Sequence, residues 1–338
     1  MYDFLLSEEA RRLRADLIHA YEYPLILDAF YGPARSLGVP LVGTVYAMAV
    51  PSWLPRSAAL IAGTEGLVAE ARRVGQWATL IEPPVDLAHD DPAAVDGAAF
   101  RARHGIAEDE IVLGIVCRLN PDMKEEGVRR AIDATRQLEA RHGPRFRLLV
   151  TGWGPSGEAL SARAAEVNVA LGRPAVVLTG ALTDPRPAYA AADIALGMGG
   201  SALRSMAFAK PLIVLGVGGF SRPFERETAS FFFDEGFYGI GSGAPDPLAA
   251  QIEALLDPAR RQRVGEWARE VVRGRYGLEQ AVDRLEAVFE EALGRSTRWL
   301  PAALHTTVQR SASELVPPDV RRRVSPAVRR ALAWQAPS

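Results

Sequence analysis

Short runs of β-branched and other apolar residues alternate with segments of helical periodicity along the first part of the chain. The runs predict strands at residues 16–20, 40–46, 58–62 and 78–82, with helices at residues 25–36 and 65–74. Prolines and acids then interrupt every periodicity from Glu82 to Pro92, and we interpret this stretch as a linker between domains. The alternation is typical of a parallel sheet wrapped by helices.

The second part repeats the pattern more cleanly. It predicts strands at residues 111–117, 146–151, 175–179, 193–196 and 212–215. A helix after the first of these strands ends at Gly143-Pro144, and the pattern after Pro245 is helical through about Leu293. The chain therefore reads as two α/β domains followed by a tail that begins at Arg295 and carries eight arginines.

Composition narrows the class of protein. The chain has 338 residues, 48% of them hydrophobic, with a net charge of -2, as in an ordinary globular protein of two domains. This charge argues against a nucleic-acid binder, and a single cysteine, Cys117, excludes a disulfide framework. No signal peptide and no run of about 18 apolar residues is visible, so we expect a cytoplasmic protein.

Arg118 and Lys124 follow the first strand of the second domain, where ligands sit in open parallel sheets. Asp122 and Glu125 fit a capping box, which predicts Lys124 in the first turn of the next helix. A lysine there opposes the helix dipole, and only two of the 39 basic residues are lysines, Lys124 and Lys210. An anion shared by the two side chains accounts for this arrangement; solvated loop charges are the alternative.

Glycine-bearing turns follow three further strands. Gly152-Trp-Gly-Pro-Ser-Gly matches the dinucleotide fingerprint, but the next strand ends in Thr179-Gly180 and lacks a ribose-binding acid. A tight turn therefore explains its glycines better than a nicotinamide cofactor does. In the next turn Gly199 and Gly200 allow close approach of a phosphate to the backbone and Ser201 is expected as the N-cap, although close helix packing explains the glycines equally well. The last turn begins at Gly216; it is either a connection or a loop that closes over a ligand.

Candidate catalytic side chains lie near the start of the chain. His19 ends the first predicted strand, and Tyr21 and Glu22 lie just beyond it, at the edge of the sheet where function is common. The other histidines lack metal-ligand spacing, and no acidic D-x-D cluster, nucleophile elbow or P-loop is present, so no metal site is predicted.

The order of these motifs resembles glycosyltransferase family 4, from about Asp16 to Leu293. The matching landmarks are Ala15-Asp-Leu-Ile-His-Ala-Tyr-Glu-Tyr-Pro, the linker Ile81-Glu-Pro-Pro-Val-Asp-Leu, Phe100-Arg-Ala-Arg-His-Gly-Ile, Gly152-Trp-Gly-Pro, Leu178-Thr-Gly and Tyr189-Ala-Ala-Ala-Asp. The resemblance implies the GT-B fold, in which two Rossmann-like parallel-sheet domains face a cleft. Arg118 and Lys124 match the residues that bind the donor diphosphate in such enzymes.

The chain departs from the family at several positions. Leu196 and Arg204 stand where the family carries two glutamates, and Tyr21 and Tyr46 stand at histidine positions. The resemblance therefore suggests a subfamily without the glutamate pair, in which Arg204 is expected to reach the diphosphate. The complete set of expected donor-binding residues is Arg118, Lys124, Gly152, Gly154, Thr179, Gly199, Gly200, Ser201 and Arg204.

The resemblance implies retaining, metal-independent transfer of a sugar from a nucleoside diphosphate sugar, as co-substrate and without a cofactor, to an acceptor near His19, Tyr21 and Glu22. A non-catalytic glycosyltransferase-like partner is the main alternative, because both glutamates are missing. A sugar-nucleotide epimerase of the same architecture is a further alternative. A nicotinamide-dependent oxidoreductase is not expected, because the ribose-binding acid of such enzymes is absent.

We expect a shortened acceptor-side domain at residues 1–85, a donor domain at 86–294 and a basic tail at 295–338, solvated or packed back on the first domain as a helix. Contact of the tail with an anionic membrane surface is the alternative. The first domain is about half the size usual in the family, so we expect either a start upstream of Met1 or a partner or second copy that covers its sheet edge.

Overall fold

The computed structural model describes residues 2–241, 243–244, 247–295 and 306, with side chains from residue 4 onward. The chain divides into two compact units, Met1–Pro83 with Glu279–Ser338 and Pro84–Leu278. Apart from Arg295 and Thr306, the basic tail lies outside the described residues.

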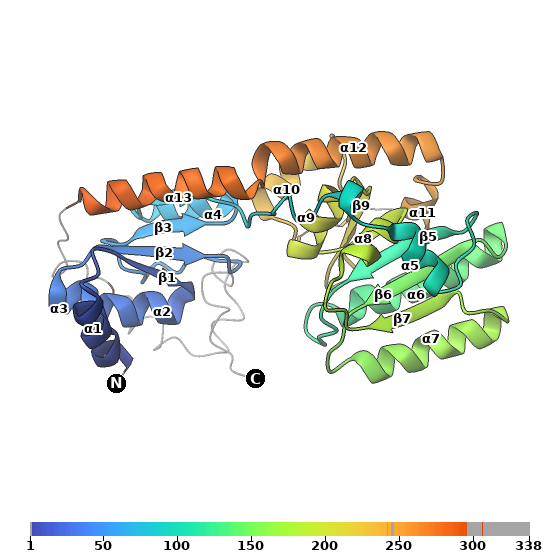
Figure 1. Cartoon of the computed structure of the whole chain (residues 1–338), viewed down its shortest axis with the longest axis horizontal. Coiled ribbons are helices and arrows are strands. Elements are labelled where there is room, and N and C mark those ends of the chain that lie inside the picture. Colours follow the sequence, from blue (N-terminus) through green and yellow to red (C-terminus); the bar gives the residue numbers. More distant parts are fainter. Residues whose placement is uncertain (1, 242, 245–246, 296–305, 307–338) are drawn as a thin grey trace. The chain divides into compact units, whose positions relative to one another are not determined.

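The first unit is built on a four-stranded parallel sheet in the order β1-β2-β3-β4. Side chains alternate between the two faces of this sheet. Leu60 packs on the face that α2 and α4 cover, whereas Val42 and Ile61 pack on the opposite face, against α13 (Figure 1). The elements are α1 (Tyr2–Leu13), β1 (Ile18–Tyr21), α2 (Glu22–Ala29), a π-helical turn (Phe30–Ala34), α3 (Arg35–Leu37), β2 (Leu41–Val45), β3 (Ala59–Ala62), α4 (Glu65–Arg73), β4 (Ala78–Leu80) and α13 (Leu278–Leu293).

Two predictions for this unit differ from the structure. The single helix expected at residues 25–36 is broken at Gly32 and Pro33, because Gly32 has non-helical backbone angles and proline lacks an amide donor. Helix α13, expected within the domain of residues 86–294, groups with the first unit, since its Val288 and Ala292 are buried against β2 and β3. A helix that returns to the first unit was expected only after residue 295.

The second unit contains a six-stranded sheet in the order β10-β9-β8-β5-β6-β7. Five strands are parallel, as the alternating pattern predicts, and β10 is an antiparallel edge strand that the pattern did not reveal. The strands are β5 (Ile111–Val116), β6 (Phe146–Thr151), β7 (Val176–Gly180), β8 (Ile194–Gly197), β9 (Leu212–Leu215) and β10 (Ser221–Pro223).

Helices cover both faces of this sheet. Apolar residues of α6, α7 and α11 pack on one face, and those of α5, α8, α9 and α12 pack on the other. The helices are a 3₁₀ turn (Pro92–Ala94), α5 (Gly97–Arg103), α6 (Glu125–His142), α7 (Gly157–Leu171), α8 (Arg186–Ala191), α9 (Gly200–Ala207), α10 (Ala229–Glu235), α11 (Leu248–Glu253) and α12 (Pro258–Arg275). Ligands in such doubly wound sheets sit beyond the carboxyl ends of the strands.

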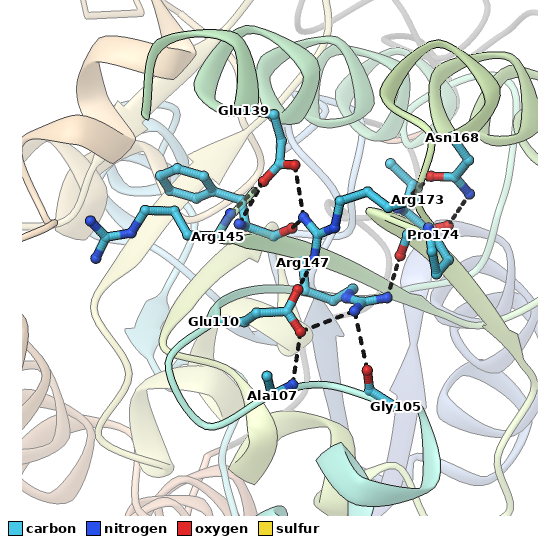
Figure 2. Close-up of polar contacts among 11 residues, drawn as sticks. Gly105, Ala107, Glu110, Glu139, Arg145, Arg147, Asn168, Arg173 and Pro174 are labelled. Atoms are coloured by element: carbon cyan, nitrogen blue, oxygen red, sulfur yellow. Dashed lines mark hydrogen bonds and ion pairs between the residues drawn. The ribbon is translucent and has the colours of Figure 1, made fainter. Parts of the chain in front are cut away.

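A buried network of ion pairs joins the opposite, amino ends of these strands (Figure 2). Glu110 pairs with Arg147 at 3.0 Å and with Arg173, and both carboxylate and guanidinium of the Glu110–Arg147 pair are 6% exposed. Arg173 also contacts Glu139 at 2.7 Å, and Glu139 accepts the backbone N–H groups of Arg145 and Phe146. The network fixes the starts of β5, β6 and β7 and lies away from the edge where ligands bind.

Candidate functional site

The β5–α6 loop places Arg118 and Lys124 at the carboxyl edge of the second unit's sheet. Arg118 is exposed and Lys124 is half-buried at the N-cap of α6. Among the described residues neither side chain forms a hydrogen bond or an ion pair. Burial lowers the pKa of the Lys124 ammonium against the opposing effect of the Cys117 thiol, and the nearby charge of Arg118 lowers it further. Two cations that lie close together without a counter-charge form a site suited to an anion.

The expected capping box is not formed. Helix α6 begins at Glu125, so Lys124 precedes its first turn, and the structure shows no side-chain cap. The Asn120 carbonyl closes the loop instead, accepting the backbone N–H groups of Lys124 at 3.2 Å and Glu125 at 3.0 Å. The Glu125 carboxylate accepts the Ser156 hydroxyl at 2.7 Å and pairs with Arg129. Asp122 is exposed, and solvent is a better partner for its charge than a helix that begins three residues later.

Gly152 and Gly154, in the β6–α7 turn, support the loop that carries Arg118. Both have left-handed backbone angles, φ +145° and +156°, and a Cβ on them would lie 1.8 Å from the Cys117 carbonyl oxygen and 2.5 Å from that of Leu119. Only glycine permits this approach. The structure therefore places these two glycines against the loop backbone, as a tight turn requires.

The β8–α9 turn presents a helix N-terminus at the same edge. Its N-cap is Gly199, with φ +59°, and not Ser201 as expected, because the Ser201 hydroxyl donates back to the Met198 carbonyl at 2.9 Å. A Cβ on Gly199 or Gly200 would meet nothing within 4 Å. The Gly199 carbonyl accepts the N–H groups of Ala202 and Leu203, whereas those of Gly200 and Ser201 precede the first helical bond, and the open space there leaves room for a ligand oxygen.

Thr179 and Arg204 are engaged with protein partners. The Thr179 hydroxyl donates to Thr151 Oγ1 at 2.9 Å. The Arg204 guanidinium makes a bidentate pair with the buried carboxylate of Asp90, at 2.7 and 2.6 Å, and lies 5.1 Å from the centre of the Tyr189 ring. The expected contact of Arg204 with a diphosphate thus competes with an ion pair already formed, unlike the contacts expected of Arg118 and Lys124.

The β9–β10 turn, interpreted as a connection or a closing loop, is held by α6. The Glu126 carboxylate accepts the N–H of Gly218 at 2.9 Å and that of Gly219 at 2.6 Å. Both glycines have positive φ, +62° and +77°, a conformation in which successive amides converge on one anion. The Arg130 guanidinium adds a 2.8 Å bond to the Phe220 carbonyl. The turn is therefore fastened two residues from Lys124.

Replacing Glu126 by alanine is expected to release this turn. Hydrogen–deuterium exchange at Gly218 and Gly219 should accelerate by at least tenfold, because both amides lose their acceptor. Glu166→Ala, at an exposed position of α7, is the matched control and should leave this exchange unchanged. Unaltered exchange in Glu126→Ala would show that other contacts hold the turn.

In the first unit His19, Tyr21 and Glu22 gather where β1 ends. His19 lies within β1, which continues to Tyr21, so His19 does not end the strand as predicted. Its Nε2 lies 2.8 Å from Thr44 Oγ1, and its ring centre is 4.6 Å from that of Tyr21. Glu22 has φ +62°, and its carboxylate accepts the backbone N–H of Tyr46 at 3.0 Å. The structure thus brings the His19 and Tyr21 rings together and directs the Glu22 carboxylate to the backbone that follows β2.

Burial shifts two of these groups toward their neutral forms. It lowers the pKa of His19, and it raises the pKa of Glu22 against the opposing effect of the Tyr46 N–H. A neutral imidazole can accept a proton, and a carboxyl with a raised pKa exchanges protons nearer to neutral pH.

Glu126 and Asp90 were not predicted as functional residues. Glu126 carries a local signal, because it follows Lys124 closely in Lys124-Glu-Glu-Gly. Asp90 lies in the predicted linker, far from its partner Arg204 along the chain, and has no such signal.

Within the described ranges, no group of three His, Cys, Asp or Glu side chains is placed to hold a metal ion. No helix in that part of the chain has the length and apolar character needed to cross a membrane.

Comparisons with known proteins show which family the chain resembles. Residues 110–258 match the family model described as glycosyl transferases group 1. The chain is 28% identical to a 2-deoxystreptamine glucosyltransferase of Streptomyces kanamyceticus, over 84% of this chain and 80% of that protein. It is 31% identical to a D-inositol 3-phosphate glycosyltransferase of Geodermatophilus obscurus, over 89% of this chain and 73% of that protein.

The crystal structure of HepE from Anabaena, in complex with UDP, superposes with a TM-score of 0.66 at 17% identity, over 85% of this chain and 81% of that one. The two parallel sheets thus define a GT-B-like fold. The chain belongs to the glycosyl transferases group 1 family. It is a nucleotide-sugar glycosyltransferase by class, as the order of its motifs indicated.

Proposed function

We propose that the chain transfers a sugar from a nucleoside diphosphate sugar to an acceptor with retention of configuration and without a divalent metal. The observation that carries the proposal is the pair of cations, Arg118 and Lys124, at the carboxyl edge of the second unit's sheet. Neither has a counter-charge among the described residues, whereas Arg204 and Lys210 are both engaged.

The two cations act on the leaving group. As the bond to the sugar breaks, negative charge grows on the diphosphate, and each charge-assisted contact contributes about 1.5–3 kcal/mol. The N–H groups of Gly200 and Ser201, at the start of α9, add dipoles of the same sign. Because these charges are fixed before the donor arrives, they take the part that a divalent cation takes in other transferases.

The first unit supplies the acceptor side in this proposal. His19 and Glu22 lie at the end of β1. The pKa of His19 is lowered and that of Glu22 is raised, and a neutral imidazole or a carboxylate of raised pKa is suited to take up the proton of an acceptor hydroxyl. Tyr21, whose side chain is 49% exposed, offers a ring and a hydroxyl for binding an acceptor.

Thermal unfolding with UDP, GDP, ADP and dTDP tests the donor site. We expect one nucleotide at 100 times its Kd to stabilise the protein by about 2.7 kcal/mol, with EDTA without effect on either binding or donor turnover. UDP is the first choice, because HepE, of the same fold, was crystallised with UDP-glucose. Absence of any shift across the four nucleotides would overturn the proposal.

A non-catalytic role is the second candidate, favoured by Leu196 and Arg204 at the positions of the family's glutamates. Slow hydrolysis of the bound donor, measured as release of the free sugar, distinguishes an enzyme from a non-catalytic protein. An enzyme should hydrolyse its donor at a rate that falls in a Lys124→Ala variant, whereas a non-catalytic protein binds the nucleotide and leaves the donor intact.

A further inference from the structure

Trp153 is an exposed aromatic residue at the carboxyl edge of the second unit's sheet. It is 70% exposed, although it lies only two residues beyond the fully buried strand β6. It lies in the Gly152-Trp-Gly turn. The close approach of the loop backbone requires the two glycines, but the indole between them does not pack into the hydrophobic core. The exposed indole therefore offers an aromatic face at the edge of the sheet where ligands bind.

The backbone that carries Trp153 is rigid. Gly152 and Gly154 are wedged against the carbonyl groups of Cys117 and Leu119, and the Trp153 carbonyl accepts the Leu119 N–H at 2.9 Å. The backbone that carries the indole is thus fixed next to the loop of Arg118. A ligand that binds the indole need order only the side chain and not the turn.

The strand order places Trp153 on one side of the cation pair. Strand β5, which leads to Arg118, lies between β8 and β6. A diphosphate held over β5 therefore directs one end of the donor toward β8, with its open glycine turn, and the other toward β6, with Trp153. The turn at β8 offers amides, which suit the oxygens of a sugar, and the turn at β6 offers an aromatic face, which suits a base.

We propose that the indole of Trp153 is the stacking surface for the base of the nucleotide donor. The proposal rests on the proposed function of the cation pair. The Gly180 carbonyl accepts the Gly152 N–H at 2.9 Å, which keeps the end of β7 beside this surface. Stacking alone tolerates any base, so Trp153 contributes affinity for the nucleoside, and the neighbouring backbone selects among bases.

Isothermal titration of the full chain with two probes tests this role. The probes are the nucleoside diphosphate that gives the largest thermal shift and inorganic pyrophosphate. Trp153→Ala should weaken nucleotide binding by about 5- to 100-fold and leave pyrophosphate binding unchanged, and Trp153→Phe should restore most of the loss. Val169→Ala, at an exposed apolar position of α7, is the control and should alter neither.

The outcomes separate this inference from the function on which it rests. Equal nucleotide affinity in wild type and Trp153→Ala would overturn the stacking role and leave the transferase proposal standing. An equal loss for pyrophosphate would show that Trp153 acts only on the shape of the Arg118 loop, which also overturns it. Absence of nucleotide binding in the wild type would overturn both.

Discussion

Replacing Lys124 by alanine is expected to lower donor turnover by about 10²- to 10³-fold, the loss typical when one preorganised group is removed from a developing anion. The melting temperature should change little, since Lys124 has no ion pair among the described residues and its burial disfavours its charge. Turnover of a nucleotide sugar and a thermal melt, measured on the same preparation, check both halves of this expectation. Unchanged turnover would remove Lys124 from the leaving-group site.

The sign of the pH dependence follows from the lowered pKa. A lysine whose pKa is lower in the folded protein than in the unfolded chain destabilises the fold while it is charged, and this cost is lost as pH rises from the folded value to the ordinary one. A bound diphosphate favours the charged form, so donor affinity should fall as pH rises through the same range, below the ordinary value of 10.5. Lys124→Arg should remove this fall, because arginine stays charged.

Lys210 provides the matched control, since it is the other lysine of the sequence. Its Nζ donates to the Ala190 carbonyl at 2.9 Å, and burial lowers its pKa as well. Lys210→Met should therefore alter stability and leave nucleotide affinity unchanged. A loss of affinity as large as that of Lys124→Ala would mean that general charge, and not position, controls binding.

Replacing Glu110 by alanine should destabilise the second unit by about 3–5 kcal/mol, because the buried guanidinium of Arg147 loses its carboxylate (Figure 2). The carbonyl groups of Pro174 and Gly105 still accept from this guanidinium, but they carry no net charge to balance it, and Arg147 Nε has no acceptor among the described atoms. The melting temperature should fall by roughly 6–20 °C.

The control for Glu110→Ala is Glu166→Ala, which breaks the exposed pair with Arg163 and should leave the melting temperature unchanged. Nucleotide affinity, measured well below the melting temperature, should be equal in the wild type, Glu110→Ala and Glu166→Ala, since the ion-pair network lies at the amino ends of the strands. A specific loss of affinity in Glu110→Ala would show that the two edges of the sheet are coupled.

The parallel strands of both sheets could be predicted because each is a short apolar run between turns. The predicted bounds agree with the structure for β6 and β9 and differ by one or two residues elsewhere. Helix α1 and strand β10 were missed for opposite reasons. Helix α1 leaves Phe4, Leu5 and Leu13 exposed, so its apolar positions do not form one buried stripe, and β10 has three residues including a proline.

The candidate site was predictable where its residues are close in sequence. Arg118 and Lys124 share one loop, and the rarity of lysine distinguished Lys124. The partners that fix the neighbouring elements are far apart in the chain: Asp90 with Arg204, and Glu126 with Gly218. Only the packing of the sheet brings such pairs together, so composition and spacing could not reveal that Arg204 is already paired.

Cys117 gives the β5–α6 loop a chemical reporter of its own. It is the sole cysteine of the sequence, its backbone is pressed against Gly152, and burial raises the pKa of its thiol to about 11. A thiol with so high a pKa is mostly protonated near neutral pH, so it reacts slowly with an alkylating reagent. The rate of alkylation at this one site therefore reports on the surroundings of the loop that carries Arg118 and Lys124, and a bound donor that orders the loop should slow it.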